Sequence, residues 1–296
     1  MGLVAALEPS IEEFAAEVGA EGPVTIAGLA TRGGPVPGVR TVMAPGGVVE
    51  IRPEEMTIRC GAGTPVEEID AALAEHGQTV AIPPSGTVGG ALAVAHSGIR
   101  RLGYGPIRDT VLQIRYVDSR GQVVKAGGPT VKNVSGFDLC RLMVGARGTL
   151  GFLAEVILRT RPRAPFEQWY SGVVAPADVL TRLYRPTSLL WDGTRVWALL
   201  EGHADDVAEQ AASVGLVPAD GPPELPTGGR WSLTPSELPR LEGTGRFVAE
   251  LGVGIVHHER PAPERPVDPA VRRLHARLKH AFDPDGRLNP GVEVLP

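Results

Sequence analysis

Residues 83–93 read Pro83-Pro84-Ser85-Gly86-Thr87-Val88-Gly89-Gly90-Ala91-Leu92-Ala93. The paired glycines Gly89 and Gly90 open a run of small residues, which predicts a short helix directly after a tight turn. Glycines at such a turn leave backbone N–H groups bare, and a phosphate group can approach them because no Cβ intervenes. A turn in front of a buried helix, without any ligand, is the alternative interpretation of this stretch.

Three more glycine-rich segments follow, each between ordered elements. Residues 97–109 read Ser97-Gly98-Ile99-Arg100-Arg101-Leu102-Gly103-Tyr104-Gly105-Pro106-Ile107-Arg108-Asp109, where arginines beside glycines suit a pyrophosphate or a solvated loop. Residues 131–139 read Val131-Lys132-Asn133-Val134-Ser135-Gly136-Phe137-Asp138-Leu139, with a possible helix cap at Asp138. Residues 145–155 read Gly145-Ala146-Arg147-Gly148-Thr149-Leu150-Gly151-Phe152-Leu153-Ala154-Glu155, and here a strand begins at a glycine bend.

The common nucleotide-binding motifs do not account for these glycines. The sequence has no G-x-G-x-x-G between a strand and a helix with an acidic residue suitably downstream. It also has no P-loop lysine, because Gly86-Thr87 is not part of a Gly-Lys-Ser/Thr motif. A phosphate-binding role therefore requires another scaffold.

Composition narrows the function classes. The 296 residues carry a net charge of −5 and form no Lys/Arg cluster, which argues against a nucleic-acid surface. Apolar runs are short and interrupted by Gly or Pro, so we expect no transmembrane segment and no signal peptide. The two cysteines, Cys60 and Cys140, lack metal-ligand spacing, so we predict buried thiols, no metal site and no iron–sulfur cluster held by this chain alone. A cytoplasmic location follows as the expectation.

Local patterns predict a mixture of helices and strands. Ile11, Phe14, Ala15 and Val18 have helical spacing, and Phe152–Arg159 reads as a strand. Thr64-Pro65-Val66-Glu67 is typical of a helix start, with Thr64 as the cap. Further expected elements are the strands 24–27, 48–52 and 57–60, the hairpins 110–125 and 189–200, the helix 204–214, the strands 246–251 and 254–258, and the helix 269–280.

The order of the four glycine-rich segments resembles the FAD-binding domain of the vanillyl-alcohol oxidase/PCMH superfamily. More narrowly, it is similar to the FAD-binding E subunits of bacterial glycolate oxidases. The tail Phe282-Asp283-Pro284-Asp285-Gly286-Arg287-Leu288-Asn289-Pro290-Gly291 also resembles that of glycolate and D-lactate dehydrogenase flavoproteins. The resemblance is strong from about Val48 to Pro162 and in the tail, and weak in between.

The resemblance implies an α+β fold with a PCMH-type, two-subdomain FAD-binding domain. That domain would cover residues 1–165, a reduced α+β cap 166–267, and a C-terminal helix and tail 268–296 would return to the FAD domain. The residues implied to bind FAD are Pro84, Ser85, Gly86, Thr87, Gly89, Gly90, Gly98, Arg101, Gly103, Tyr104, Gly105, Gly148, Thr149, Gly151, Leu153 and Asn289. Lys132, Asn133 and Asp138 belong to the motif without an assigned role.

The sequence departs from the family pattern in two places. The N-terminal phosphate loop reads Gly28-Leu29-Ala30-Thr31-Arg32-Gly33-Gly34, so we expect Leu29 and Ala30 to crowd the cofactor. The cap is short and lacks the histidine- and acid-containing motif of the family's catalytic dehydrogenases. Its catalytic candidates are His257 or His258 as the base and Arg260 as the carboxylate ligand, and the alternative is that all three are ordinary residues at a strand end.

The function implied is that of an FAD-dependent oxidoreductase subunit. It would oxidise a 2-hydroxy acid such as glycolate or D-lactate by hydride transfer to flavin, and pass electrons to a partner. The expected partners are a second flavoprotein subunit and an iron–sulfur subunit, which would also provide any membrane association. One alternative is a non-catalytic FAD-binding accessory subunit. Another is a reductase resembling UDP-N-acetylenolpyruvoylglucosamine reductases, against which the segment 131–138 and the Asn-Pro-Gly tail argue.

Overall fold

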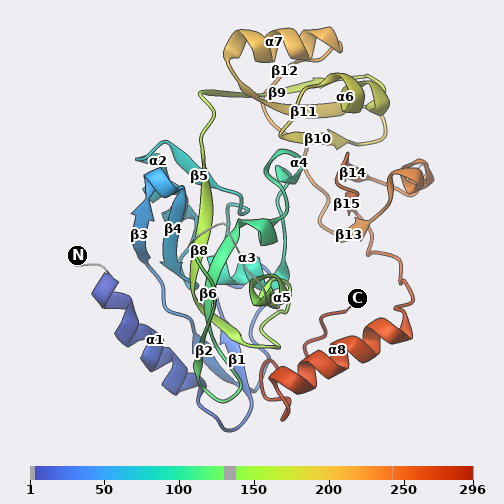
Figure 1. The fold of residues 1–296 in the computed structure, drawn as a ribbon. Helices are drawn as coiled ribbons and strands as arrows, with labels where there is room; N and C mark the ends of the chain where they lie inside the picture. The colour runs from blue at the N-terminus through green and yellow to red at the C-terminus, as the bar shows by residue number, and fades with distance from the viewer. Residues whose placement is uncertain (1–3, 130–137, 242, 296) are drawn as a thin grey trace. The chain divides into compact units, whose positions relative to one another are not determined.

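The computed structural model describes residues 4–129, 138–241 and 243–295, and the chain forms two compact units (Figure 1). Unit 1 comprises residues 1–97, 106–162 and 266–296. Unit 2 comprises residues 98–105 and 163–265. The mixture of helices and sheets agrees with the α+β class expected from the sequence.

Unit 1 contains two sheets. A small parallel sheet pairs β1 (Val24–Ala27) with β2 (Arg40–Met43). The larger, antiparallel sheet has the order β3-β4-β8-β6-β7, and β5 pairs with the end of β8. Its strands are β3 (Val48–Arg52), β4 (Thr57–Gly61), β5 (Gln78–Val80), β6 (Val111–Val117), β7 (Val123–Gly127) and β8 (Phe152–Pro162). The 3-10 turn η1 (Pro53–Glu55) lies between β3 and β4, and η2 (Ile107–Thr110) directly precedes β6.

Strand β8 organises the unit 1 core. Every residue from Phe152 to Leu158 is buried, because the strand lies centrally in the sheet and has neighbours on both faces. One face packs with the helices α2 (Val66–Ala74), α3 (Val88–Val94) and α5 (Leu139–Met143). On the other face, α1 (Val4–Val18) contributes Ile11, Phe14, Ala15 and Val18, which confirms the predicted apolar helix face.

The predicted capping role of Thr64 is wrong. Helix α2 begins at Val66, and Pro65 is the residue before its first turn. The Thr64 hydroxyl instead donates to Gly61 O at 2.6 Å and accepts from Gly47 N at 2.9 Å. Thr64 is fully buried, and its side chain joins two neighbouring loops rather than capping the helix.

Unit 2 is built on one antiparallel sheet of seven strands in the order β12-β9-β11-β10-β14-β15-β13. Helices α6 (Pro176–Arg182) and α7 (Ala204–Ser213) cover one face, where Val179 and Val207 join the core (Figure 1). The strands are β9 (Phe166–Gly172), β10 (Ser188–Trp191), β11 (Val196–Gly202), β12 (Val217–Ala219), β13 (Gly229–Ser232), β14 (Phe247–Glu250) and β15 (Ile255–His258). Unit 2 also contains α4 (Arg101–Tyr104) and η3 (Pro235–Leu241).

The last helix, α8 (Pro269–Phe282), belongs to unit 1 and leads into the C-terminal tail. Asp268 caps its start by accepting from Ala270 N at 2.7 Å. Both cysteines are buried free thiols. Within the described ranges, no helix combines the length and hydropathy needed to cross a bilayer.

Candidate functional site

Unit 1 contains a cavity of about 300 Å³ where the N-terminal loop, the start of α3 and the start of β8 meet. Eight of its lining residues are glycine, and two are arginine. The glycines are Gly28, Gly33, Gly34, Gly63, Gly89, Gly90, Gly148 and Gly151. Most other lining residues are apolar, including Phe152 and Leu153.

Several of these glycines cannot carry a side chain. A Cβ at Gly89 would lie 2.9 Å from Ala62 O, and one at Gly148 would lie 2.6 Å from Asn289 Nδ2. Gly148 also has a φ of 69°, which non-glycine residues adopt at a cost. At Gly33 and Gly34 a Cβ would meet nothing within 4 Å, so the backbone there borders open space. Part of the cavity wall is therefore bare backbone, which a ligand could approach closely.

The N-terminal loop places Leu29 and Ala30, the two residues expected to crowd the cofactor, in the lining of the cavity. The Leu29 side chain is 57% exposed. Ala30 has a φ of 55°, the left-handed conformation in which glycine is the usual residue. The departure from glycine therefore places strain on the backbone at Ala30, and crowding of the cofactor stays a prediction.

Asn289 connects the C-terminal tail to two walls of the cavity. Its Oδ1 accepts from Thr25 Oγ1 at 2.8 Å and from Ile26 N at 3.2 Å. Its Nδ2 donates to Arg147 O at 2.7 Å. A φ of 44° suits asparagine better than most residues. One side chain thereby fixes strand β1 and the bend before β8 against each other.

Arg287 anchors the same tail, and the sequence analysis assigned it no role. The side chain is 4% exposed and donates five hydrogen bonds to carbonyl oxygens. Its acceptors are Val18, Gly19, Glu21, Gly22 and Ser119. Val18 ends helix α1, where a cation also offsets the negative end of the helix dipole. The sequence signal for Arg287 was its position two residues before Asn289, which is a predicted site residue.

The predicted cofactor residues of unit 1 fall into two groups. Seven line the cavity, and they are Thr87, Gly89, Gly90, Gly148, Gly151, Leu153 and Asn289. Pro84, Ser85 and Gly86 belong to the adjoining loop, where Arg32 contacts Ser85. Thr149 does not line the cavity, because its buried hydroxyl donates to Ala146 O at 2.7 Å within the bend.

The other predicted cofactor residues, Gly98, Arg101, Gly103, Tyr104 and Gly105, belong to unit 2. Gly103 N donates to Thr187 O at 3.1 Å, and a Cβ there would lie 2.8 Å from Thr187 Cα. The Tyr104 hydroxyl donates to Glu201 Oε1 at 2.7 Å. These contacts explain the glycine and the tyrosine by packing within unit 2, so their contact with FAD stays a prediction.

Arg100 adds an ion pair to the contacts that hold residues 98–105 within unit 2. Its guanidinium binds both carboxylate oxygens of Glu167, at 2.7 and 2.9 Å, in the bidentate geometry that arginine favours. This hydrogen-bonded ion pair raises the pKa of Arg100 and lowers the pKa of Glu167.

Lys132 and Asn133 lie outside the described residues. Asp138 caps α5 by accepting from Arg141 N at 3.0 Å.

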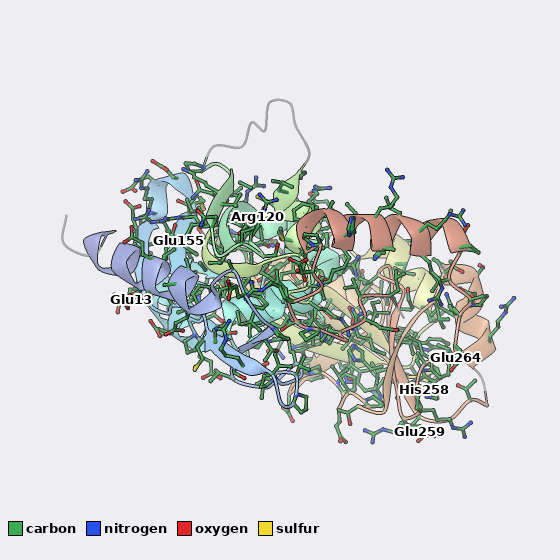
Figure 2. The ribbon with its side chains drawn as sticks, turned by 90° about the horizontal axis from the view of Figure 1, so that it is seen from below. Glu13, Arg120, Glu155, His258, Glu259 and Glu264 are labelled. Carbon is green, nitrogen blue, oxygen red and sulfur yellow. The ribbon has the colours of Figure 1, made fainter. Side chains whose placement is uncertain are left out.

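Of the three catalytic candidates, His258 has the surroundings of a residue that stabilises the fold. It is fully buried in unit 2, and its ring stacks on Trp231 with ring centroids 3.9 Å apart. Figure 2 labels His258 and the neighbouring Glu259. Its Nδ1 accepts from Arg260 N at 2.9 Å, and its Nε2 lies 3.1 Å from Thr244 Oγ1. Burial lowers the pKa of His258. With both nitrogens engaged, His258 has no free atom for a substrate.

Arg260 lies beyond the end of β15. Its side chain is 65% exposed, and its nearest ionic partner is Glu259 at 3.8 Å. Such a pair at the surface contributes little energy. A carboxylate-binding role for Arg260 stays a prediction without support from its surroundings.

His257 has a different environment, because it pairs with a buried carboxylate. Its Nε2 lies 2.9 Å from Glu250 Oε1 on the neighbouring strand β14. Glu250 is 2% exposed, and its Oε2 has no hydrogen-bond partner among the described residues. The sequence analysis missed Glu250. Its spacing of seven residues from His257 across a tight turn was the signal, since a hairpin brings two such positions together.

More polar groups share the sheet face of this pair. Arg230 is directly opposite His257 in the strand register, so the two side chains lie on one face. Burial lowers the pKa of Arg230, with Glu250 opposing and Arg101 adding to the shift. Ser188 also shares this face, as it lies two residues before Leu190, which pairs with Glu250. Its buried hydroxyl has no partner within the described part of the chain.

The unit 1 cavity fits FAD by its chemistry. Bare glycine backbone and two arginines suit a pyrophosphate, and the apolar wall with Phe152 and Leu153 suits aromatic rings. No Asp or Glu is among its lining residues. The structure describes no cluster of three or more His, Cys, Asp or Glu side chains that could hold a metal ion, as far as its described residues extend.

Comparison with known proteins identifies the same cofactor. A family model described as an FAD binding domain matches residues 39–127. The glycolate oxidase subunit GlcE of Escherichia coli is 28% identical, with 83% of this chain and 84% of that protein covered. The D-lactate dehydrogenase of Archaeoglobus fulgidus is 35% identical, but the match covers 39% of this chain and 27% of that protein. For the Bacillus subtilis glycolate oxidase subunit GlcD the identity is 28%, and 59% and 40% are covered.

Solved structures show the same fold at low sequence identity. Alkyldihydroxyacetonephosphate synthase superposes with a TM-score of 0.68 at 14% identity, covering 97% of this chain and 74% of that one. Berberine bridge enzyme superposes with a TM-score of 0.53 at 15% identity, covering 70% and 47%. The chain thus binds FAD through a domain of this fold, and it is similar to glycolate oxidase subunits and to a D-lactate dehydrogenase.

Proposed function

We propose that this chain is an FAD-binding subunit of a complex that oxidises a 2-hydroxy acid such as glycolate or D-lactate. The observation that carries the proposal is the similarity to a glycolate oxidase subunit along most of both chains. The glycine-lined cavity of unit 1 supports the cofactor part. The polar face of unit 2 supports the substrate part, because it contains an acid–base pair and a buried arginine.

In this proposal the cavity glycines and Asn289 would hold FAD, which would supply the two-electron acceptor for oxidation of the hydroxy acid. His257 takes the hydroxyl proton, since it is half-buried and its ring is oriented by Glu250 at 2.9 Å. Arg230 binds the substrate carboxylate, because a carboxylate would offset the desolvation of its guanidinium. Ser188 and Glu250 Oε2 offer further polar contacts.

A non-catalytic accessory subunit is the second candidate. The matches to D-lactate dehydrogenase and GlcD leave more than half of those proteins uncovered. His258 and Arg260, two of the three catalytic candidates, lack a catalytic environment. In this case the chain binds FAD, and a larger partner carries out the oxidation.

Partner chains belong to both versions of the proposal. The similar Escherichia coli protein is itself described as a subunit. Cys60 and Cys140 are buried, and burial raises the pKa of both thiols, so a cluster that receives electrons would come from another chain. We propose a second flavoprotein subunit and an iron–sulfur subunit as partners. A cytoplasmic location, with any membrane association through these partners, is part of the proposal.

The first experiment is an absorbance spectrum of the purified chain, followed by anaerobic addition of glycolate, D-lactate or D-2-hydroxyglutarate. Bleaching of the flavin band by one acid supports autonomous oxidation and identifies the substrate. A band that stays oxidised, alone and with partners, contradicts oxidation by this chain. A chain that retains no flavin and binds no added FAD contradicts the whole proposal.

Variants then test the base. We expect His257→Gln to slow bleaching by about 10²- to 10⁴-fold, the usual contribution of a general base, while the FAD content is unchanged. Glu250→Gln should slow it less, because His257 remains. His203→Gln is the matched control, since His203 is exposed in the same unit. Equal bleaching rates for His257→Gln and His203→Gln would refute the assignment.

A further inference from the structure

Helix α8 differs from α1, α2, α3 and α5, because none of its residues is buried. Most helices in proteins are stabilised by packing one apolar face, so this 14-residue helix gains little from its own unit. Its C-terminal end is fastened, since Lys279 Nζ donates to Thr149 O at 2.8 Å and to Leu288 O at 3.0 Å. Residues 269–274, at the other end, are all exposed. The first turns of α8 therefore present a surface that the described part of the chain leaves uncovered.

This surface has an apolar side next to a groove. Val271, Leu274 and Leu278 are spaced three and four residues apart, so they lie on one side of the helix. Val271 is 40% exposed and Leu274 is 52% exposed. A groove of about 590 Å³ lies between α8, the bend before β8 and the C-terminal tail, and Leu150 and Leu295 are among its apolar lining residues. We call it the α8 groove.

The charge of α8 is positive throughout. The helix contains four Arg or Lys residues, two His and no Asp or Glu, although the whole chain has a net charge of −5. Lys279 pairs with Asp283, whereas Arg272, Arg273 and Arg277 form no ion pair with any residue that the structure describes. One acid, Glu293, is among the groove-lining residues. Three guanidinium groups beside an apolar groove are complementary to an acidic segment that also carries apolar side chains.

The α8 groove adjoins the FAD cavity. Both are lined by the bend before β8, where Ala146 and Leu150 line the groove while Gly148 and Gly151 line the cavity. Val292 of the tail lines both. A chain docked in the groove is therefore placed beside the cofactor cavity, and electron transfer to a partner requires such a short separation.

We propose that α8 and its groove dock an acidic amphipathic helix of a partner chain. Apolar side chains of that helix occupy the groove, and its carboxylates pair with Arg272, Arg273 and Arg277. A lipid surface fits less well, because a flat bilayer cannot follow a concave groove and α8 offers it two exposed apolar side chains. The inference rests on the proposed function in taking the partner from the proposed complex, and it adds where that partner binds.

The test is fluorescence-anisotropy titration of the full-length chain with a labelled synthetic helix that has leucine on one face and glutamate on the other. Arg273→Gln/Arg277→Gln should weaken binding about 3- to 20-fold, because two surface charges are lost. Leu274→Ser should weaken it about 5- to 10-fold, because a half-exposed leucine no longer becomes buried. Arg240→Gln/Arg265→Gln is the matched control, since it removes two charges from exposed side chains of unit 2 and should bind as wild type. Wild-type binding should weaken with added salt.

Four outcomes overturn the inference. The first is equal affinity of the wild type and the α8 variants for the acidic helix, and the second is equally tight binding of a lysine-containing helix with the same leucine face. The third is binding of the wild type to vesicles of phosphatidylglycerol and phosphatidylcholine without binding of the acidic helix, which would assign α8 to a membrane surface. The fourth is self-association in sedimentation that the α8 variants abolish, which would make a second copy the occupant. The proposed function fails by a different measurement, the bleaching of the flavin band, which the α8 variants should leave unchanged.

Discussion

Replacing Asn289 tests how the tail builds the cofactor cavity. The side chain is 8% exposed and makes three hydrogen bonds, with Thr25, Ile26 and Arg147. Removing it leaves the Arg147 carbonyl and the Ile26 amide without these partners. Alanine would also have to adopt the φ of 44° that Asn289 has. The two effects can be separated with a glycine variant, because glycine adopts this conformation without strain.

The expected magnitudes follow from these contacts. Each lost hydrogen bond costs about 1 kcal/mol, and the left-handed backbone costs alanine about 1 kcal/mol. Asn289→Ala should therefore lower the free energy of unfolding of unit 1 by about 4 kcal/mol, and Asn289→Gly by about 3 kcal/mol. Asn289→Asp keeps the acceptor but replaces the Nδ2 donor, so we expect a loss of about 2 kcal/mol. For a unit of this size, about 4 kcal/mol corresponds to a fall in Tm of roughly 10 °C.

The assay is thermal unfolding of the apo chain followed by circular dichroism, with Arg120→Gln as the control. FAD titration of the same variants shows whether the cavity is weakened together with the fold. A Tm for Asn289→Ala within about 3 °C of wild type would refute the hydrogen-bond argument. A glycine variant less stable than the alanine variant would refute the backbone argument.

Three further predictions concern the same units. Arg287→Gln should lower the free energy of unfolding by about 4 kcal/mol, because five carbonyl groups lose a buried cationic donor. A guanidinium chloride unfolding curve that matches that of the wild type would contradict this. His258 has a lowered pKa, so the unfolded state binds the proton more readily. The stability it contributes is complete above its ordinary pKa of about 6.5 and is lost as pH falls below that value, and in His258→Gln the Tm should depend less on pH between 7.5 and 5. Gly148→Ala should weaken FAD binding by about tenfold or more, because the new Cβ meets Asn289 at a left-handed backbone position, and unchanged titration curves would disprove it.

Periodic segments were predictable because their patterns are local. The buried run of β8 predicts its strand, and the apolar spacing of Ile11, Phe14 and Val18 predicts the inner face of α1. The turns were less predictable. Thr64 has the sequence of a helix cap, but its hydroxyl bonds to Gly61 and Gly47 instead. A hydroxyl can satisfy a loop or a helix end, and only the fold decides which partner is near.

The candidate site also has features that the sequence predicts and features that depend on the fold. The glycines of segments 83–93 and 145–155 marked the cavity, because bare backbone is a property of residue type. The pairing of His257 with Glu250, and the two engaged nitrogens of His258, depend on strand register and on which face each residue occupies. Adjacent histidines on a strand face opposite sides, so the sequence could not assign their partners.

By itself, the sequence determined the α+β class, the glycine segments and the FAD-binding resemblance, because backbone freedom and hydrophobic period are encoded locally. Only the tertiary structure decided that Gly98–Gly105 belongs to unit 2. It also decided that Arg287 forms a hydrogen bond with α1 and Asn289 one with β1. It likewise decided the contact of Arg32 with Ser85. These contacts join residues 53 to 269 positions apart in sequence or depend on which unit a loop packs against. Long-range packing energies, rather than local preferences, select them.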